Sequence, residues 1–589
     1  MVATSTNLFK INTYTNPGEL LDRISPKDLE GAKVTFINMP IREQMAPNAP
    51  PMGPAILAAR LQSYGVETRI IDLNAYRIKD EESRRRNLPN GRFFTFLEAE
   101  RLIEESFQQY GDQMLIGLSG LITTLHWQEK VAEMVRKLQP QAVLVAGGGL
   151  ATEFREILFH WIPELDGIVH SEGEDVIVKM AYDAKLIYDK GLKGATDSGK
   201  LKPYFIGTHS GRARFSYDGG RTKDLDSIPF PAWDLFNTDI HGNPLLENYI
   251  KTPVWGNATG NSSATPFTMK RSLTMISSRG CPFACKFCFR GAQGERNYGM
   301  RSSQNIIAEI VHDKEKYNTD FIGITDDNFM VNAKRIIDLA EQMKPVLSEM
   351  DVHWGTHGRL DEAADLKPAR DKSHSITDSI RRVDKMYEAG CRYIGFGAES
   401  ASSYMLEEMG KGGFMLVGGE TRINGYDFPM TMVEGIKNTK AAGIHANCTW
   451  IMGYPGENLE HLKTSVAFIK WQEEHYTQGL TPGTPEYKIH SESVNKCMFV
   501  ATAYPGTELF KHPTVREKLS AVFGLSFDEK TKDPLPDDNL KKYVEELGDA
   551  SKVLVGDGGT LYYGNMDLDQ FKEASEHVNS GNLYKILDM

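Results

Sequence analysis

The chain has 589 residues and a net charge of −12, with 40% apolar and 25% charged residues. This length suffices for two to four globular domains, and the acidic balance excludes the basic surface typical of nucleic-acid-binding proteins. No apolar run approaches the roughly 18 to 20 residues that span a bilayer. The N-terminal stretch lacks the basic and apolar regions of a signal peptide. We therefore expect a cytoplasmic protein that binds neither nucleic acid nor membrane.

The first domain is predicted to be an α/β domain that follows an N-terminal extension, residues 1–30. Strand-like and helix-like segments alternate through residues 31–190. This alternation favours a Rossmann-like, doubly wound parallel sheet, on which ligands bind at the carboxyl ends of the strands. The expected strands are 33–40, 66–74, 114–120, 142–149 and 166–171, and the expected helices are 52–65, 94–110 and 125–139.

The composition then changes twice. Residues 191–270 include a Gly-, Asn- and Ser-rich stretch and are expected to form a linker. From 271 to 480 the alternation resumes with five or six strand–helix units, which predicts a full or partial barrel, a (β/α)6 barrel for six units. Residues 481–589 are expected to form a mainly helical capping region. Chemistry on such a barrel belongs at the carboxyl ends of its strands.

Three of the six cysteines lie within eight residues, in the stretch "CPFACKFC" after the first predicted barrel strand. Cys281, Cys285 and Cys288 have the spacing C-x3-C-x2-C. A structural zinc site is one interpretation, although zinc sites usually pair their cysteines at C-x2-C or add spaced histidines. A 4Fe-4S cluster normally takes four thiolates. Three cysteines would leave one iron open to another ligand.

The cysteine spacing, with aromatic Phe287 before the last cysteine, resembles the radical S-adenosylmethionine (SAM) superfamily. Further segments resemble this family in the same order along residues 270–510: "FIGITDDNF", "YIGFGAES", "IMGYPGE" and "AYPGTELF". The resemblance implies a 4Fe-4S cluster on the three cysteines, whose open iron chelates SAM. It also implies SAM-binding roles for Phe287, Asp326, Glu399 and Gly453. Asp326 and Glu399 are alternatively structural carboxylates at loops.

The N-terminal domain resembles cobalamin-binding domains. In "IGLSGLITT", Ser119 and Thr123 match hydroxyl residues that contact the buried nucleotide tail of the cofactor. "VAGGGLAT" resembles the glycine turn after the next strand, which implies contacts from Gly147, Gly148 and Gly149. Glu172 lies in "SEGED", which resembles the "GEGE" segment of cobalamin-binding radical SAM enzymes. A cobalamin-type sheet that has lost its ligand is the alternative.

The sequence departs from the cobalamin-domain pattern at the lower face of the cobalt. Asn48 and Pro50 stand where D-x-H-x-x-G domains carry the aspartate and the cobalt-ligating histidine. The departure implies base-off cobalamin without a histidine ligand. Arg42, Gln44 and Met45 are candidates for that face; the alternative is a plain surface loop.

The resemblance as a whole implies a cobalamin-dependent radical SAM methylase. The 5'-deoxyadenosyl radical would abstract hydrogen from an unactivated carbon, which would then collect a methyl group from methylcobalamin. An enzyme with the same cofactors that performs oxidative cyclisation or ring rearrangement is the alternative; a cobalamin sensor or carrier would leave the cysteines unexplained. Expected partners are a small-molecule or peptide substrate and an electron donor such as flavodoxin or ferredoxin. The insertions 367–377 and 412–430 are expected near the catalytic face.

Overall fold

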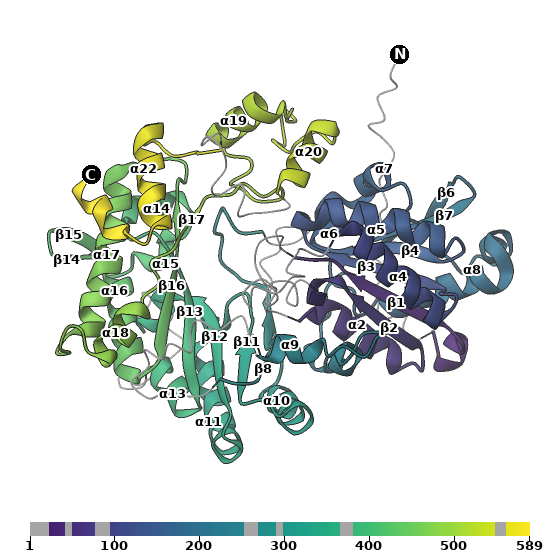
Figure 1. Ribbon diagram of the computed structural model, residues 1–589, viewed down its shortest axis with the longest axis horizontal. Helices are drawn as coiled ribbons and strands as arrows, with labels where there is room; N and C mark the ends of the chain where they lie inside the picture. Colours follow the sequence, from purple (N-terminus) through teal and green to yellow (C-terminus); the bar gives the residue numbers. More distant parts are fainter. Residues whose placement is uncertain are drawn as a thin grey trace.

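The computed structural model describes residues 23–41, 50–76, 95–251, 269–289, 298–365, 381–547 and 561–589. It contains two large, mainly parallel sheets, each covered by helices, which lie beside one another (Figure 1). The N-terminal sheet has seven strands and the second sheet six. The polypeptide after the second sheet crosses back over the top of both, so that three parts of the chain meet around one central region (Figure 1).

The N-terminal sheet has the strand order β2-β1-β3-β4-β5-β7-β6. All neighbouring pairs are parallel except β6 with β7. This arrangement confirms the doubly wound sheet. The sheet nevertheless continues beyond residue 190, where we expected the linker, because β7 pairs with β5. The strands are β1 (Lys33–Asn38), β2 (Glu67–Asp72), β3 (Leu115–Gly120), β4 (Val143–Gly148), β5 (Gly167–His170), β6 (Phe205–His209) and β7 (Arg212–Asp218).

Two apolar layers hold this sheet, because its buried strands direct successive side chains to opposite faces. Val34 and Phe36 of β1 pack with helices α2 and α8, whereas Ile37 packs with α4 and α5. Thr95 caps α4, since its hydroxyl accepts from the Glu98 amide at 3.3 Å. The helices are α2 (Met52–Gln62), α4 (Phe96–Tyr110), α5 (Leu125–Leu138), α6 (Gly149–Phe154), α7 (Leu158–Trp161) and α8 (Ile177–Asp197), with the short η1 (Pro26–Leu29), η2 (Ile122–Thr124) and η3 (Arg155–Ile157).

The connection between the sheets is short helical structure that packs on the first domain. It comprises η4 (Leu225–Ser227), η5 (Trp233–Phe236) and α9 (Leu246–Lys251). The Trp233 and Phe236 side chains are fully buried in the same core as α2 and α8. Residues 252–268 of the expected linker lie outside the described residues.

The second sheet is a partial barrel of six parallel strands in the order β17-β16-β13-β12-β11-β8. Helices cover its outer side (Figure 1). This confirms the predicted (β/α)6 barrel. The barrel nevertheless continues beyond residue 480, where we expected the capping region, because β17 at 498–500 pairs with β16. The strands are β8 (Ser272–Met275), β11 (Phe321–Ile324), β12 (His353–Arg359), β13 (Cys391–Glu399), β16 (His445–Met452) and β17 (Met498–Val500), with the small pair β9 (Ser278–Arg279) and β10 (Gly299–Met300).

The barrel helices are α10 (Ser303–Tyr317), α11 (Ala333–Met350), α12 (Leu360–Ala363), α13 (Arg382–Glu388), α14 (Ser403–Glu408), α15 (Gly412–Met415), α16 (Met430–Ala442), α17 (Leu459–Thr477) and α18 (Pro485–Glu492), together with η7 (Phe329–Val331). The insertion 412–430 forms α15 and the hairpin of β14 (Glu420–Ile423) and β15 (Tyr426–Pro429). Phe428 of this hairpin packs on Phe468 and Trp471 of α17, outside the barrel. The other insertion, 367–377, lies outside the described residues.

The C-terminal region is mainly helical, as predicted, and it joins the two domains. It contains α19 (Pro513–Phe523), α20 (Asp538–Glu546), α22 (Leu568–Asn579) and η8 (Leu583–Asp588). Tyr543 and Val544 of α20 share one apolar core with the α4 and α5 side of the first sheet. Lys541 of α20 forms an ion pair of 2.7 Å with Glu129 of α5. Across the described part of the chain, no helix is long and apolar enough to span a membrane.

Candidate active site

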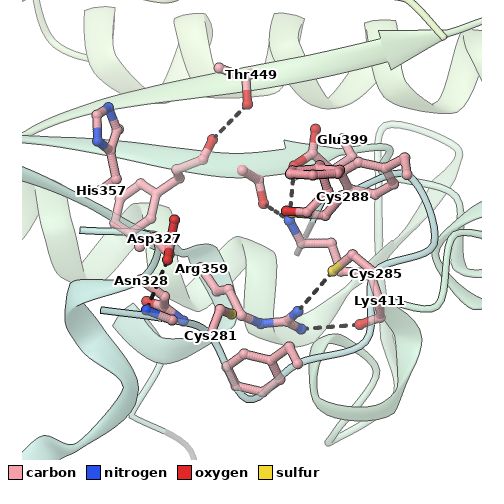
Figure 2. A pocket seen from close by; sticks show the side chains of 18 of the residues that line it. Cys281, Cys285, Cys288, Asp327, Asn328, His357, Arg359, Glu399, Lys411 and Thr449 are labelled. Carbon is pink, nitrogen blue, oxygen red and sulfur yellow. Dashed lines mark hydrogen bonds and ion pairs between the residues drawn. The ribbon is translucent and has the colours of Figure 1, made fainter. Parts of the chain in front are cut away.

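A cavity of about 540 Å³ opens at the carboxyl ends of the barrel strands, between the barrel and the first domain. Glu172 and Arg221 of the first domain line it together with the three clustered cysteines. Figure 2 shows the charged side chains gathered around this cavity. The remaining lining residues are Arg279, Gly280, Phe283, Phe287, Phe289, Asp327, Asn328, His357, Gly358, Arg359, Tyr393, Gly395, Phe396, Gly397, Glu399, Lys411, Asn447 and Thr449.

The cysteine loop follows β9 and is held at its middle by backbone hydrogen bonds. The Lys286 amide donates to the Met409 carbonyl at 2.9 Å, and the Lys286 carbonyl accepts from the Leu509 amide at 2.7 Å. Cys281 and Cys285 are half-buried and Cys288 is exposed. Among the described residues, no three His, Cys, Asp or Glu side chains are close enough to hold a single metal ion. An iron–sulfur cluster needs no such group, because each cysteine binds a different iron.

One cationic side chain next to the cysteines fits an anionic cluster. Arg359, at the end of β12, donates from Nη1 to Cys285 Sγ at 3.8 Å. Its guanidinium lies 4.2 Å from the centre of the Phe283 ring and donates to the Lys411 carbonyl at 3.1 Å. An ion pair of 3.0 Å with Asp361 fixes its direction. A buried guanidinium stabilises thiolate sulfur beside it, so the three cysteines and Arg359 would hold the cluster.

Glu399 reaches the cavity through an unusual backbone conformation. It lies at the end of β13 with φ +66°, in the left-handed region that side-chain-bearing residues rarely adopt. The register between β13 and β16 shifts between Gly397 and Glu399, as at a β-bulge. Its carboxylate pairs with Lys411 Nζ at 3.0 Å, and both side chains are almost fully buried. Such strain is typical of binding sites, and the pair presents donors and acceptors to a polar ligand such as SAM.

The two neighbouring aspartates after β11 point in different directions. Asp326 is buried and accepts hydrogen bonds from the amide and hydroxyl of Ser277, both 2.6 Å, and from the Ser278 hydroxyl. Asp327 lines the cavity and accepts from the Gly280 amide at 2.9 Å. Asp326 is therefore placed behind the cysteine loop, whereas Asp327 is placed where we expected Asp326.

Gly453 is also placed away from the cavity. It has φ +75°, and a Cβ added there would lie 3.2 Å from the rings of Tyr562 and Phe571. Its amide donates to buried Glu457, whose pKa burial raises to about 8. The turn thus packs against the C-terminal region. Phe287, by contrast, lines the cavity between two of the cysteines.

The predicted cobalamin-binding residues gather at the carboxyl ends of β3 and β4. Ser119, Thr123, Gly147 and Gly149 are half-buried and Gly148 is exposed. Here the ends of β3 and β4 lie against each other through glycine backbone. A Cβ on Gly148, which has φ +89°, would lie 2.3 Å from the Gly120 carbonyl oxygen. At Gly147 and Gly149 a Cβ would meet nothing closer than 3.8 Å.

These strand ends therefore leave a smooth, open surface that fits the close approach of a large ligand. Its position matches the place where doubly wound sheets bind their ligands. The candidates for the lower cobalt face, Arg42, Gln44 and Met45, lie outside the described residues.

Glu172 links the two domains. Its carboxylate lies 3.1 Å from Arg279 Nη1 and 3.9 Å from Arg221 Nε. Glu174 pairs with the same Arg279, and Arg221 donates to the Arg279 carbonyl at 2.7 Å. Burial lowers the pKa of Arg279, but the carboxylates of Glu174 and Glu172 raise it by more, so the net pKa is increased. We call these four residues the interdomain clamp; it fixes the start of the cysteine loop, since Arg279 stands two residues before Cys281.

Several residues of this site lie in no recognisable sequence motif. Arg359 and Lys411 lie outside the motif segments, and only their positions, at the end of β12 and in the segment after β13, indicate the cavity. His357, Asn447 and Thr449 line the barrel interior, yet each occurs within an ordinary strand pattern. The insertion 412–430 contributes none of the described lining residues. Its first part lies near the catalytic face, as expected, because Phe414 packs on Phe283 of the cysteine loop, whereas its hairpin packs on the outer helix α17.

The parallel partial barrel, its cysteine loop and the ligand-binding edge of the first sheet together have the architecture expected of a radical SAM enzyme with a second, doubly wound domain. The family model of the radical SAM superfamily matches residues 275–469. The sequence is 24% identical over 401 residues to an uncharacterised methyltransferase of Pyrococcus horikoshii, covering 68% of this chain and 69% of the relative. It is 23% identical over 486 residues to cytidylyl-2-hydroxyethylphosphonate methyltransferase of Streptomyces wedmorensis, covering 77% and 80%.

A third relative is the anaerobic magnesium-protoporphyrin IX monomethyl ester cyclase of Cereibacter sphaeroides, with 26% identity over 385 residues, which cover 64% of this chain and 52% of the relative. Among solved structures, the cobalamin-dependent SAM radical enzyme OxsB has a TM-score of 0.58 at 16% identity, covering 94% of this chain and 72% of that one. The radical SAM methyltransferase TsrM from Kitasatospora setae has a TM-score of 0.51 at 15% identity, covering 85% and 77%. These likenesses establish the fold. Residues 275–469 match the radical SAM superfamily, and the chain shares its overall fold with cobalamin-dependent radical SAM enzymes.

Proposed function

We propose that the chain is a methyltransferase that uses SAM, a 4Fe-4S cluster and cobalamin to methylate an unactivated carbon. The observation that carries this proposal is that Glu172 and Arg221 of the first domain line one cavity with Cys281, Cys285 and Cys288. The relatives named as methyltransferases support methyl transfer. When bound, the cluster and SAM would supply the 5'-deoxyadenosyl radical, and cobalamin would supply the methyl group.

The residues of this chain would bind and orient these groups. The three cysteines would hold the cluster, with Arg359 beside Cys285 as counter-charge. The Glu399–Lys411 pair and Asp327 would bind polar parts of SAM. Holding two reactants in place lowers the barrier without new chemistry from the protein.

The aromatic side chains of the cysteine loop would keep water from this region. Phe283, Phe287 and Phe289 all line the cavity, and Phe283 packs edge-on against Phe414 at 5.4 Å. Exclusion of water protects a reactive radical from side reactions. These rings would therefore form a dry wall beside the cluster.

The first domain would hold cobalamin on the open surface formed by Gly147, Gly148 and Gly149, with Ser119 and Thr123 on the nucleotide tail. The sequence from residue 38 to residue 51 contains no histidine, so cobalamin would bind base-off without a histidine ligand from this loop. Electron paramagnetic resonance of the cobalt(II) form tests this point. Nitrogen splitting in that spectrum would contradict it.

The decisive experiment compares two cysteine variants of the anaerobically purified chain. After reconstitution with iron, sulfide and hydroxocobalamin, SAM and a strong reductant are added, and 5'-deoxyadenosine and methylated cobalamin are measured. Cys285→Ala should lose the deoxyadenosine, whereas Cys497→Ala, which removes an exposed cysteine outside the cluster loop, should keep it. Flavodoxin or ferredoxin should be able to replace the chemical reductant.

A cyclising or rearranging enzyme is the second candidate, because one relative is a magnesium-protoporphyrin ester cyclase. The product mass separates the two. A gain of one CH2 marks methylation, and a loss of hydrogens or a gain of oxygen marks the other chemistry. Deoxyadenosine without any cobalamin binding would contradict the methyltransferase proposal.

A further inference from the structure

The deep end of the cavity lies inside the barrel, away from the cysteines. Figure 2 shows His357 across the cavity from Cys285 and Cys288. The strand register brings His357 beside Gly395 and Gly395 beside Asn447, so these residues form one layer inside the barrel. Thr449 pairs with Gly397 in the layer above, and Tyr393 lies below. We call His357, Tyr393, Asn447 and Thr449 the barrel floor.

Glycines on β13 leave the space that the barrel floor occupies. A Cβ on Gly395 would lie 2.6 Å from His357 Cδ2 and 3.6 Å from Tyr393 Cε1. The His357 and Tyr393 rings therefore both lie over Gly395. Because real side-chain contacts are not this short, any other residue at 395 would push the imidazole away. The sequence thus keeps two polar rings turned into the cavity.

The barrel floor carries no net charge at neutral pH. Burial lowers the pKa of His357 to about 4 and raises that of Tyr393 to about 12. Asn447 and Thr449 are neutral. The charged groups among the described lining residues lie near the cysteines and the domain boundary, where Glu399 pairs with Lys411 and Glu172 pairs with Arg279. An anionic group on the barrel floor would therefore be buried without a counter-charge, which is costly.

One acceptor on the barrel floor is left without a partner. Asn447 Nδ2 donates to the Tyr393 hydroxyl at 2.6 Å, which fixes the direction of the carboxamide. Asn447 Oδ1 is buried and has no hydrogen-bond partner among the described residues. A buried acceptor without a donor costs about 1–3 kcal/mol. A ligand that donates a hydrogen bond here would recover that energy.

We propose that the barrel floor binds an uncharged, hydrogen-bond-donating planar group of the substrate, such as a carboxamide or lactam, with Asn447 as the residue that selects it. This inference deepens the proposed function and rests on it, because the bound group is a substrate group only if the chain is the proposed methyltransferase. The planar shape follows from the His357 and Tyr393 rings, which both lie over Gly395. A carboxylate or phosphate group would be rejected.

Three probes of equal shape and different charge test this proposal: 4-fluorobenzamide, 4-fluorobenzoate and 4-fluorobenzamidine. Their binding to the full chain is followed by fluorine NMR, without turnover. Wild type should bind the amide at least about tenfold more tightly than the carboxylate. Asn447→Leu should abolish this preference, and Asn447→Asp should shift preference to the cationic amidine. Thermal unfolding shows that each variant is folded.

Each result has a separate meaning. Equal binding of amide and carboxylate, or no amide binding at millimolar concentration, would overturn the proposal. Amide binding that is unchanged in folded Asn447→Leu would also overturn it, because the probe would then lie elsewhere. If S-adenosylhomocysteine displaces the amide and binds more weakly to Asn447→Leu, the floor belongs to SAM and not to the substrate. Since no turnover is involved, a failure of methylation leaves these results intact, and the two proposals are tested separately.

Discussion

Removing the carboxylates of the interdomain clamp should uncouple the two domains. In the double variant Glu172→Gln/Glu174→Gln, the Arg279 guanidinium loses both counter-charges. Its side chain is only 16% exposed, so water compensates for little of this loss. Leaving a buried charge without its partner costs about 3–5 kcal/mol. The residual exposure of Arg279 and the two glutamine side chains introduced beside it favour the lower end of this energy range. A loss of about 3 kcal/mol corresponds to a fall in melting temperature of about 6–12 °C for domains of this size.

The functional effect should be larger for reactions that need both domains. A shift of about 1 Å in a reactive group can cost about 100-fold in rate. We therefore expect methyl transfer from SAM to cobalamin to slow by about 10- to 100-fold, whereas deoxyadenosine formation, which needs the barrel alone, should persist. Iron content and hydroxocobalamin binding are measured alongside, because each reports on one domain.

Glu247→Gln is the matched control. Glu247 pairs with Arg271 through two contacts of 2.6 and 2.8 Å at the other end of β8. Its side chain is 37% exposed, so its loss should cost less than about 1 kcal/mol and leave both reactions unchanged. If the clamp variant slows deoxyadenosine formation as strongly as cobalamin methylation, the clamp acts on the cluster and not on domain coupling. Equal rates in variant and wild type would refute the reasoning outright.

Three further predictions concern single residues. Gly148→Ala should destabilise the chain by about 1–3 kcal/mol and weaken hydroxocobalamin binding in absorbance titrations, because the new Cβ meets the Gly120 carbonyl; an unchanged melting temperature would argue against this contact. Asp326→Ala should lower the melting temperature and the iron content together, since it leaves three donors of Ser277 and Ser278 unpaired; normal iron content would show that the loop does not depend on Asp326. Burial raises the pKa of Glu457 from 4.5 to about 8, so the folded chain binds the extra proton between these values and loses stability as pH rises through them, by up to about 1.4 kcal/mol per pH unit. Denaturant unfolding of Glu457→Gln across this range should show a flatter profile, and an unchanged profile would contradict the assignment.

The sequence predicted those features that depend on local pattern. Strand–helix alternation indicated both sheets, since apolar periodicity arises from neighbours in the chain. Cys281, Cys285 and Cys288 were visible because their spacing lies within one loop. The edge of the first sheet was less visible: β6 and β7 extend it beyond residue 190, and only pairing with β5 shows that they belong there.

The direction of a side chain was harder to predict than its place in the chain. Asp326 and Asp327 are adjacent, yet one faces Ser277 and the other faces the cavity. Within a strand, side chains alternate between the two faces and their directions can be predicted. Both aspartates lie in the loop after the strand, where this alternation no longer applies. Arg359 contacts Cys285 although the two residues are 74 positions apart in the chain. Such contacts depend on barrel closure and register, which no local pattern contains.

The C-terminal region that packs on α5 has a consequence for synthesis. Ribosomes make the first domain early, but Tyr543 and Val544, which share its apolar core, emerge some 400 residues after α5. Until then, that face of the nascent domain is exposed to water, and contacts between such distant residues form slowly. A chain cut before α20 should therefore expose this face and aggregate. A helix made some 400 residues later thus completes the apolar core of the first domain.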